Sequence, residues 1–490
     1  MEEIDLVRQL VELAVTSGRS HQSPQTNFVQ YCHQSQDEGV NHTIPVYENV
    51  LFALALIRMQ TVADVNEAKE IIGKIVGFQN LETGNFPTYI HEYPVCRDHY
   101  VCVHLLAPLY WVLKGFKKVL GKELIDQITT SMKLSLDYCS KDENFEKAPF
   151  QIAIKIAAAN VVYGKLWKDK KRQERGKKWM EELRQVSEAD DFGTWYSPVY
   201  IAETLIALQM VYEKISKSPW TKFWKMLSQT WFQPARCYIG PPVKLLQWRS
   251  EPQPTLYDLY LGDFTGGYPY HSFIDHPFQL QGALVRSIED QLEEPKMPFK
   301  VEGDVAGHTW CVKQTESYGY SVIDSGAMLP PELKEGFHHF RMVWGDENRI
   351  HSFSCQGGFF TSMTHEEVDG GVDLSFVLAE DIELLDRKKG QELCFFLDQH
   401  EGLDITVNDK KATTFNFNNK IRFKSDQMDF TMKFIFEDGD ARMMGHIQPG
   451  NRASQVDLKG DNRFKAFDWE IFLRTVRRYT SCQIKVEIRI

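Results

Sequence analysis

The chain has 490 residues, of which 43% are hydrophobic and 25% are charged, which is enough for two large domains or about three ordinary ones with buried cores. Its formal net charge of −11 argues against a nucleic acid-binding surface, because phosphate recognition needs a concentration of basic side chains. We therefore expect a globular protein without a nucleic acid partner.

The N-terminal segment, residues 1–15, has acidic side chains where a secretory signal would be positively charged, and its apolar residues are spaced as in an amphipathic helix. No run of the sequence approaches the ~18 apolar residues that span a bilayer. The nine cysteines are scattered without CxxC spacing, which favours a reducing compartment and argues against a structural zinc cluster. We expect a cytoplasmic protein with no membrane partner.

The first half of the chain is predicted to be helical, because its apolar residues recur with a period near 3.6 up to about residue 230. The predicted helices cover residues 4–17, 46–60, 64–78, 99–119, 122–139, 148–166, 170–186, 197–214 and 219–230. After the first helix they form four pairs whose starts lie about fifty residues apart, which is the pattern of an array of helical hairpins.

The connections within the pairs are short, and those that lead into each pair are long. The long connections are residues 18–45, 79–98, 140–147 and 187–196. In an array of antiparallel hairpins, all such loops lie at the same end of the domain. Long loops in a compact domain are usually functional, so this end is the predicted location of the site.

The composition changes at about residue 237, where Pro and Gly cluster and the pattern turns to a period of two. Clear examples of alternating segments are residues 308–313, 318–322, 339–345, 421–424 and 428–434. About fourteen short strands follow, which is enough for a large antiparallel β-sandwich. We predict a helical domain over 1–236, a linker and interdomain segment over 237–300, and the sandwich over 301–490.

The loop 84–94 and the residues after it concentrate groups that can take part in acid–base chemistry. His91, Tyr93 and Arg97 supply a base, an acid and an anion clamp within a short stretch of chain. Asn85, Phe86, Tyr89 and Glu92 are candidate substrate-binding residues in the same loop. The alternative interpretation is that the aromatic side chains close the end of the helical array and that Arg97 pairs with a neighbouring carboxylate.

A second candidate segment is residues 190–200, where Ser197 and Pro198 suit the first positions of a helix. Capping does not explain Trp195 and Tyr196, which either fill a core or face the same end as the first loop. Flat aromatic side chains interspersed with hydrogen-bonding groups suit sugar rings, which are apolar on one face and polar at the edge. The side chains predicted to form this surface are Phe86, Tyr89, Tyr93, Phe145, Trp195 and Tyr196.

The transition between the two halves supplies Tyr257, His271 and His276, along a segment where interdomain clefts commonly form. No matched Cys or carboxylate spacing supports a metal at these histidines, and we predict none. The sequence also has no Walker loop, dinucleotide fingerprint, nucleophile elbow or HExxH, which disfavours nucleotide-dependent and serine-hydrolase chemistry. No cofactor is predicted, and nothing in the residues indicates an oligomeric state.

This order of parts resembles the (α/α)-toroid polysaccharide lyases of the heparinase II/III-like and chondroitin AC lyase-like kinds. Residues 195–200 are similar to a Ser-Pro-x-Tyr turn that opens a toroid helix in such proteins, and residues 339–345 are similar to an early sandwich strand. The resemblance implies an α/α toroid followed by a β-sandwich. It also implies β-elimination on polysaccharides or oligosaccharides that contain uronate.

In that chemistry one group neutralises the uronate carboxylate, a His or Tyr removes the C5 proton, and a Tyr protonates the leaving oxygen. Carried onto this chain, the resemblance makes His91 or Tyr196 the base and Tyr93 or Tyr257 the acid. Arg97 and Asn85 would be the groups on the anion side. His271 would contact the substrate from the interdomain segment.

Two other functions fit the same residues. The first is a glycoside hydrolase with a carboxylate pair such as Glu92 with Asp191 or Glu48, which agrees with the acidic character of the long loops. The second is a scaffold that binds carbohydrate or protein without turnover.

Overall fold

The structure is a computed structural model, and it describes most of the helical half and most of the strands. The described residues are 8, 11–12, 14–16, 18–19, 22–30, 43–189, 198–234, 237–239, 292–305, 308–324, 338–346, 350–356, 360–378, 391–453, 467–478 and 480–490. The predicted helix 4–17 lies largely outside this set, as does most of the predicted segment 237–300.

Four helices form the interior of the helical region. They are α2 (Val46–Met59), α4 (Val101–Leu120), α7 (Phe150–Trp167) and α9 (Pro198–Val211). In α2 and α7 nearly every residue of the first three turns is buried, because their sequences are apolar on all sides. These helices contact one another in the order α2, α4, α7, α9.

Four further helices cover the interior set. They are α3 (Val62–Val76), α5 (Lys122–Cys139), α8 (Lys170–Ala189) and α10 (Thr221–Thr230). Each buries a single face, as α3 does with Ala68, Ile71, Ile72 and Ile75 at helical spacing. Short segments η1 (Ile90–Glu92), α6 (Asp142–Phe145) and η3 (Ile215–Lys217) lie in the connections.

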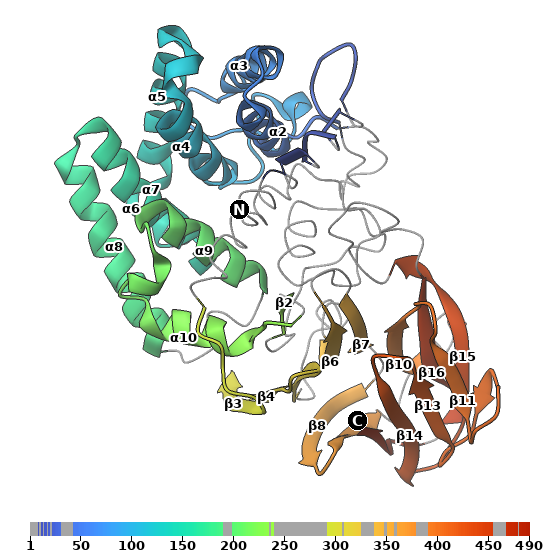
Figure 1. Cartoon of the computed structure of the whole chain (residues 1–490). Helices are drawn as coiled ribbons and strands as arrows, with labels where there is room; N and C mark the ends of the chain where they lie inside the picture. The colour runs from blue at the N-terminus through green and yellow to red at the C-terminus, as the bar shows by residue number, and fades with distance from the viewer. Residues whose placement is uncertain are drawn as a thin grey trace.

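The alternation of inner and outer helices is that of a hairpin array, and the predicted helices agree with the described ones to within a few residues (Figure 1). Three of these hairpins have turns of one or two residues, and left-handed residues close α2 at Gln60 and α7 at Lys168. The longer connection 212–220, which contains η3, joins α9 to α10. Among the described residues, no helix is both long enough and apolar enough to cross a membrane. The closure of these hairpins into a toroid stays a prediction.

The strands of the second half form two antiparallel sheets, preceded by a small hairpin of β1 (Trp231–Phe232) and β2 (Cys237–Tyr238). The large sheet has the order β12-β15-β16-β10-β7-β6-β5-β4-β3, and the small sheet has the order β11-β13-β14-β17-β9-β8. The strands of the large sheet are β3 (Phe299–Val305), β4 (His308–Gln314), β5 (Tyr318–Ile323), β6 (His338–Gly345), β7 (Ile350–Gln356), β10 (Gln391–Asp398), β12 (Thr414–Phe415), β15 (Ala441–Ala453) and β16 (Phe467–Arg478). The strands of the small sheet are β8 (Phe360–Val368), β9 (Gly371–Leu378), β11 (Asp404–Val407), β13 (Lys420–Lys424), β14 (Asp429–Asp438) and β17 (Cys482–Arg489).

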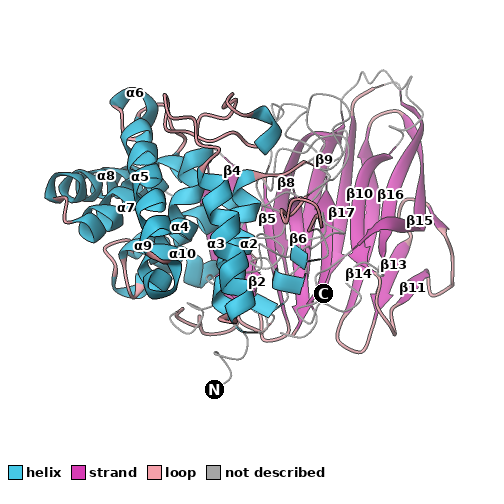
Figure 2. Ribbon diagram, turned by 90° about the horizontal axis from the view of Figure 1, so that it is seen from above, coloured by secondary structure: helices cyan, strands magenta, loops and turns pink. Residues whose placement is uncertain are grey.

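The large sheet contributes to two cores, one shared with the helices and one shared with the small sheet, and the helices lie beside the strands in Figure 2. Along β4, Trp310 and Val312 belong to the core shared with the helices, whereas Cys311 belongs to the core between the sheets. This is the expected alternation of a strand that is covered on both faces. The prediction of a helical N-terminal region followed by antiparallel sheets is therefore confirmed, and the predicted domain boundaries stay predictions.

Candidate functional site

The loop 84–100 holds two of the predicted binding residues in its interior. Asn85 is 1% exposed, and its side chain donates to the Asp98 carbonyl at 2.7 Å and accepts from the Cys102 amide at 2.9 Å. It therefore satisfies one of the free amides at the start of α4. Phe86 is fully buried in the helical core. Both side chains support the loop, and their burial leaves them no surface for a ligand.

The other predicted residues of this loop lie together on its outer side. The rings of Tyr89 and His91 are stacked with centroids 5.7 Å apart, and Tyr93 is 45% exposed. Arg97 Nε lies 3.9 Å from a carboxylate oxygen of Glu92, which agrees with the alternative interpretation of an ion pair within the loop. The loop thus offers an aromatic surface, and the Arg97 guanidinium lies next to the Glu92 carboxylate.

Four predicted site residues lie outside the described part of the chain. They are Trp195, Tyr196, Tyr257 and His271. The proposed meeting of Tyr196 and Tyr257 with His91 in one cleft therefore stays a prediction.

A second group of polar side chains lies among the first two turns of the inner helices. This inner-helix cluster consists of Tyr47 on α2, His104 on α4, Lys155 on α7 and Glu203 on α9. Because these turns follow directly on the long connections, the cluster lies at the end of the helical region where sequence analysis expected the site.

The centre of the inner-helix cluster is Lys155. Its Nζ lies 3.0 Å from Nδ1 of His104 and 2.7 Å from Oε2 of Glu203. The side chains of the ion pair are only 4% and 5% exposed. The ring of Tyr47 lies with its centroid 5.5 Å from that of His104. Tyr47 and His104 are half-buried, so a half-buried Tyr–His pair is backed by a buried Lys–Glu pair.

The loop that carries Tyr89 is fixed beside the start of α2. The Val46 amide donates to the Thr88 carbonyl at 3.0 Å, and the Ile90 amide donates to the Ile44 carbonyl at 3.0 Å. These bonds form a short antiparallel bridge between the two connections. The aromatic surface of the loop is therefore held next to the helix end that carries Tyr47.

Burial controls the protonation states in the inner-helix cluster. It lowers the pKa of His104 well below the ordinary range, and the nearby Lys155 charge lowers it further, so the imidazole is neutral at pH 7. An ammonium can only donate, so Nδ1 of His104 accepts and we assign the ring proton to Nε2. Burial also raises the pKa of Glu48 to about 7. The cluster thus combines a neutral imidazole donor with an ion pair, and Glu48, the neighbour of Tyr47 in the sequence, titrates near neutrality.

Sequence analysis named Glu48, the neighbour of Tyr47 in the sequence, but missed His104, Lys155 and Glu203. A usable signal was present, because Lys155 is the one charged residue in the run 150–164 and Glu203 is the one charged residue of 198–211. A single charge in an apolar helix is costly to bury unless it has a partner. Two such helices therefore suggest an interhelical ion pair.

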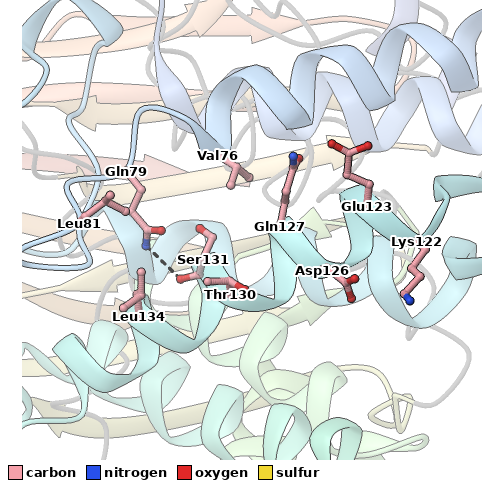
Figure 3. A pocket seen from close by; sticks show the side chains of 10 residues that line it. All are labelled: Val76, Gln79, Leu81, Lys122, Glu123, Asp126, Gln127, Thr130, Ser131 and Leu134. Carbon is pink, nitrogen blue, oxygen red and sulfur yellow. Dashed lines mark hydrogen bonds between the residues drawn. The ribbon is translucent and has the colours of Figure 1, made fainter.

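A surface groove of about 700 Å³ lies between the outer helices α3 and α5 (Figure 3). Its lining is Val76, Gln79, Leu81, Lys122, Glu123, Asp126, Gln127, Thr130, Ser131 and Leu134. The Gln79 amide donates to the carbonyls of Gly84 and Ser131, so it holds the loop against α5. No member of the inner-helix cluster lines this groove, so the groove and the cluster are separate sites.

Comparisons with known proteins leave the family of the chain open. No family model matches, and no curated protein matches the sequence. Among solved structures, the chain is similar to the chondroitin AC lyase of Streptomyces coelicolor A3, with 7% identity, 99% of this chain and 79% of that chain covered, and a TM-score of 0.46.

Two further solved structures are similar over nearly the whole chain. A chondroitinase AC lyase solved with oligosaccharides has 10% identity, covers 99% of this chain and 82% of that chain, and gives a TM-score of 0.43. A heparinase III has 10% identity, covers 99% of this chain and 84% of that chain, and gives a TM-score of 0.41. These structural neighbours are polysaccharide lyases, but identities this low and TM-scores below 0.5 do not by themselves establish a shared activity.

Proposed function

We propose that the helical region binds uronate-containing oligosaccharides at the inner-helix cluster and cleaves them by β-elimination. The observation that carries this proposal is the half-buried Tyr47–His104 pair, whose imidazole is held by the buried ion pair of Lys155 and Glu203. A tyrosine and a neutral imidazole donor are the kinds of group that the reaction requires, and the buried cation supports the imidazole.

The first requirement is neutralisation of the uronate carboxylate, because the C5 proton is otherwise too weakly acidic to be removed. We assign this role to the Nε2–H of His104, which donates to a carboxylate oxygen. The Lys155 ammonium at Nδ1 strengthens this donor by polarising the ring. Glu203 fixes the ammonium in place and is a positioning residue.

The second requirement is a proton transfer between C5 and the leaving oxygen at C4. We assign both steps to the Tyr47 oxygen, which as a phenolate takes the C5 proton. The electron pair of the C5–H bond becomes the C4–C5 double bond, and the C4–O bond breaks. The leaving oxygen then takes the proton from Tyr47, so the phenolate is restored and the atoms and charges balance.

The loop beside α2 supplies the contacts that hold the sugar chain. Tyr89 and His91 form a stacked surface next to the start of α2, and Tyr93 adds an exposed ring. Such rings suit the apolar faces of sugars. We retain His91, Tyr93 and Arg97 as predicted substrate contacts and no longer propose His91 as the base.

A second candidate function is glycoside hydrolysis. The observation that favours it is the buried carboxyl group of Glu48, whose pKa burial raises to about 7. A carboxyl group with a pKa raised in this way is typical of the general acid of a glycosidase.

The test is to incubate the purified chain with a panel of uronate oligosaccharides and to follow two signals. β-Elimination produces both an unsaturated uronate, seen by its ultraviolet absorbance, and new reducing ends. Reducing ends without the absorbance would mean hydrolysis and would contradict the lyase proposal. Binding seen by calorimetry with neither signal would leave the scaffold interpretation.

A further inference from the structure

A hollow of about 810 Å³, here called the lysine hollow, opens on the surface where α4 turns into α5. Four lysines line it, Lys114, Lys117 and Lys118 from the end of α4 and Lys122 from the start of α5. Asp126 is the one carboxylate in its described lining. Lys122 and Asp126 also line the groove between α3 and α5, so the lysine hollow and that groove are adjacent (Figure 3).

The lysine hollow concentrates positive charge in a chain whose formal net charge is −11. Its four lysines are exposed, and Lys114 and Lys118 stand four positions apart on α4, a like-charge spacing that destabilises a helix. Among the described residues, none of the four forms an ion pair with a carboxylate. Nζ of Lys114 lies 5.5 Å from the ring centroid of Tyr110. An anion in the hollow would relieve a repulsion that no described ion pair offsets.

Helix dipoles explain only part of this set of lysines. Lys117 and Lys118 lie in the last turn of α4, where a cation is favourable. Lys122 is instead the first residue of α5, and the positive end of a helix disfavours a cation. Gly121 precedes it and has no side chain to cap the free amides of that turn. The position of Lys122 therefore needs another explanation, and a bound anion supplies one.

A glycine inside α4 keeps the lysine hollow open. Gly115 lines the hollow, and a glycine inside a helix is less stable than an alanine. A Cβ at Gly115 would meet nothing within 4 Å, so packing among the described residues does not require a glycine here. A side chain at this position would instead take up space inside the hollow. The open volume and the unpaired charges are separate observations, and both indicate a ligand.

We infer that the lysine hollow binds an acidic group of a uronate-containing oligosaccharide, as a second site outside the inner-helix cluster. The choice of an oligosaccharide rests on the proposed function. Lys117 lies 13 positions after His104 on the same helix, which is about 20 Å at the rise of an α-helix. The lysine hollow therefore holds the sugar chain at a distance from the proposed chemistry.

The other polar groups beside the lysines favour a sugar chain over an acidic peptide. Asp126 lines the hollow, and Glu123 lines the adjacent groove together with Gln127 and Thr130. The two carboxylates would repel the side chains of an acidic peptide, but they can accept hydrogen bonds from sugar hydroxyls. A uronate chain carries both kinds of group, because each acidic unit also has hydroxyls.

The experiment measures how fast individual lysines of the whole chain are acetylated, by peptide mapping with mass spectrometry. The probe is a size-defined chondroitin sulphate oligosaccharide, and the chain carries Tyr47→Phe so that turnover does not consume the probe. At a concentration about ten times the dissociation constant, acetylation of Lys117 and Lys118 should slow about 10-fold. Lys170 and Lys171, which are exposed at the start of α8, should keep their rates.

Variants test whether charge and space in the lysine hollow set the affinity, which is read from the protection of Lys122. Lys117→Gln with Lys118→Gln should weaken binding roughly 5- to 25-fold at low salt, because each exposed charge pair contributes up to about a factor of five. Gly115→Leu fills the hollow without a change of charge and should weaken binding as well. The matched control, Lys170→Gln with Lys171→Gln, removes the same charge elsewhere and should bind like the parent chain.

The inference is overturned if the lysines of the hollow are no better protected than Lys170 and Lys171, or if the control weakens binding as much as the test variants. Protection by polyglutamate but not by the oligosaccharide would assign the hollow to an acidic protein segment. Equal protection by inorganic sulphate would indicate a site for any small anion. Either result would also overturn the inference. Product formation enters none of these measurements, so a failure of β-elimination would leave them unchanged.

Discussion

The ammonium of Lys155 lies 3.0 Å from Nδ1 of His104, which ties helix α7 to helix α4 in the interior of the helical region. The same ammonium pairs with Glu203 on α9 at 2.7 Å. Three inner helices therefore meet at one buried cation, and the half-buried imidazole is held in one tautomer. This relationship links the stability of the helical array to the chemistry that we propose for it.

The buried ion pair predicts a strong dependence of stability on both partners. Lys155→Met leaves the Glu203 carboxylate buried without its cation, and we expect the free energy of unfolding to fall by about 3–5 kcal/mol. The double variant Lys155→Met with Glu203→Gln has no unpaired charge, so its free energy of unfolding should fall clearly less than that of Lys155→Met alone. Urea denaturation followed by circular dichroism measures both. Equal losses in the single and double variants would contradict a coupled pair.

The proposed catalytic pair predicts a loss of rate without a loss of fold. Tyr47→Phe and His104→Gln should each lower the rate of unsaturated product formation by about 10²–10⁴-fold, the usual range for a positioned acid–base group. The controls are Tyr318→Phe and His308→Gln, which make the same changes on β5 and β4. If the control variants lost as much rate as the test variants, the assignment of the site to Tyr47 and His104 would be wrong.

The raised pKa of Glu48 predicts that the free energy of unfolding falls as the pH rises. Burial raises its pKa from 4.5 to about 7, so the folded chain holds this proton more tightly than the unfolded chain. The folded state therefore loses stability between about pH 4.5 and pH 7, by about 3 kcal/mol in total, and this group causes no further loss at higher pH. Glu48→Gln, which mimics the protonated carboxyl, should remove this loss and be the more stable protein at pH 8. A denaturation series at several pH values would contradict the idea if the two proteins changed in parallel.

Two helical glycines are predicted to respond in opposite directions to the same change. A Cβ at Gly176 of α8 would lie 2.6 Å from the Val161 amide and 2.7 Å from the Ala157 carbonyl of α7, so Gly176→Ala should destabilise by about 1–3 kcal/mol. A Cβ at Gly115 of α4 meets nothing within 4 Å, so Gly115→Ala should stabilise by about 1 kcal/mol. Thermal unfolding of the two variants tests this close approach of α7 and α8. A neutral Gly176→Ala would show that the helices can move apart freely.

Much of the secondary structure could be predicted because its causes are local. The apolar residues of 122–139 repeat at helical spacing and those of 421–424 alternate, and the structure places α5 and β13 at these positions. The order of helices before strands followed from the same patterns. These periodicities depend only on which face of each element is buried, so they are readable without knowledge of the neighbours.

The candidate sites depended on contacts between segments far apart in the chain. The loop 84–94 was chosen for its concentration of reactive side chains, yet Asn85 and Phe86 are part of the structure beneath it. The lone charges Lys155 and Glu203 suggest a buried pair, but no local pattern shows that Lys155 also meets His104, which lies 51 positions earlier in the chain.

The sequence by itself determined the helices, the strands and the end of the helical array where the long connections gather. The tertiary structure alone decided which polar side chains meet there, which ones are buried, and which protonation states they hold. The physical reason is that periodicity is a property of one element and its exposed and buried faces. The pKa of His104 and the partner of Lys155 are instead set by the distance and burial of groups on other helices.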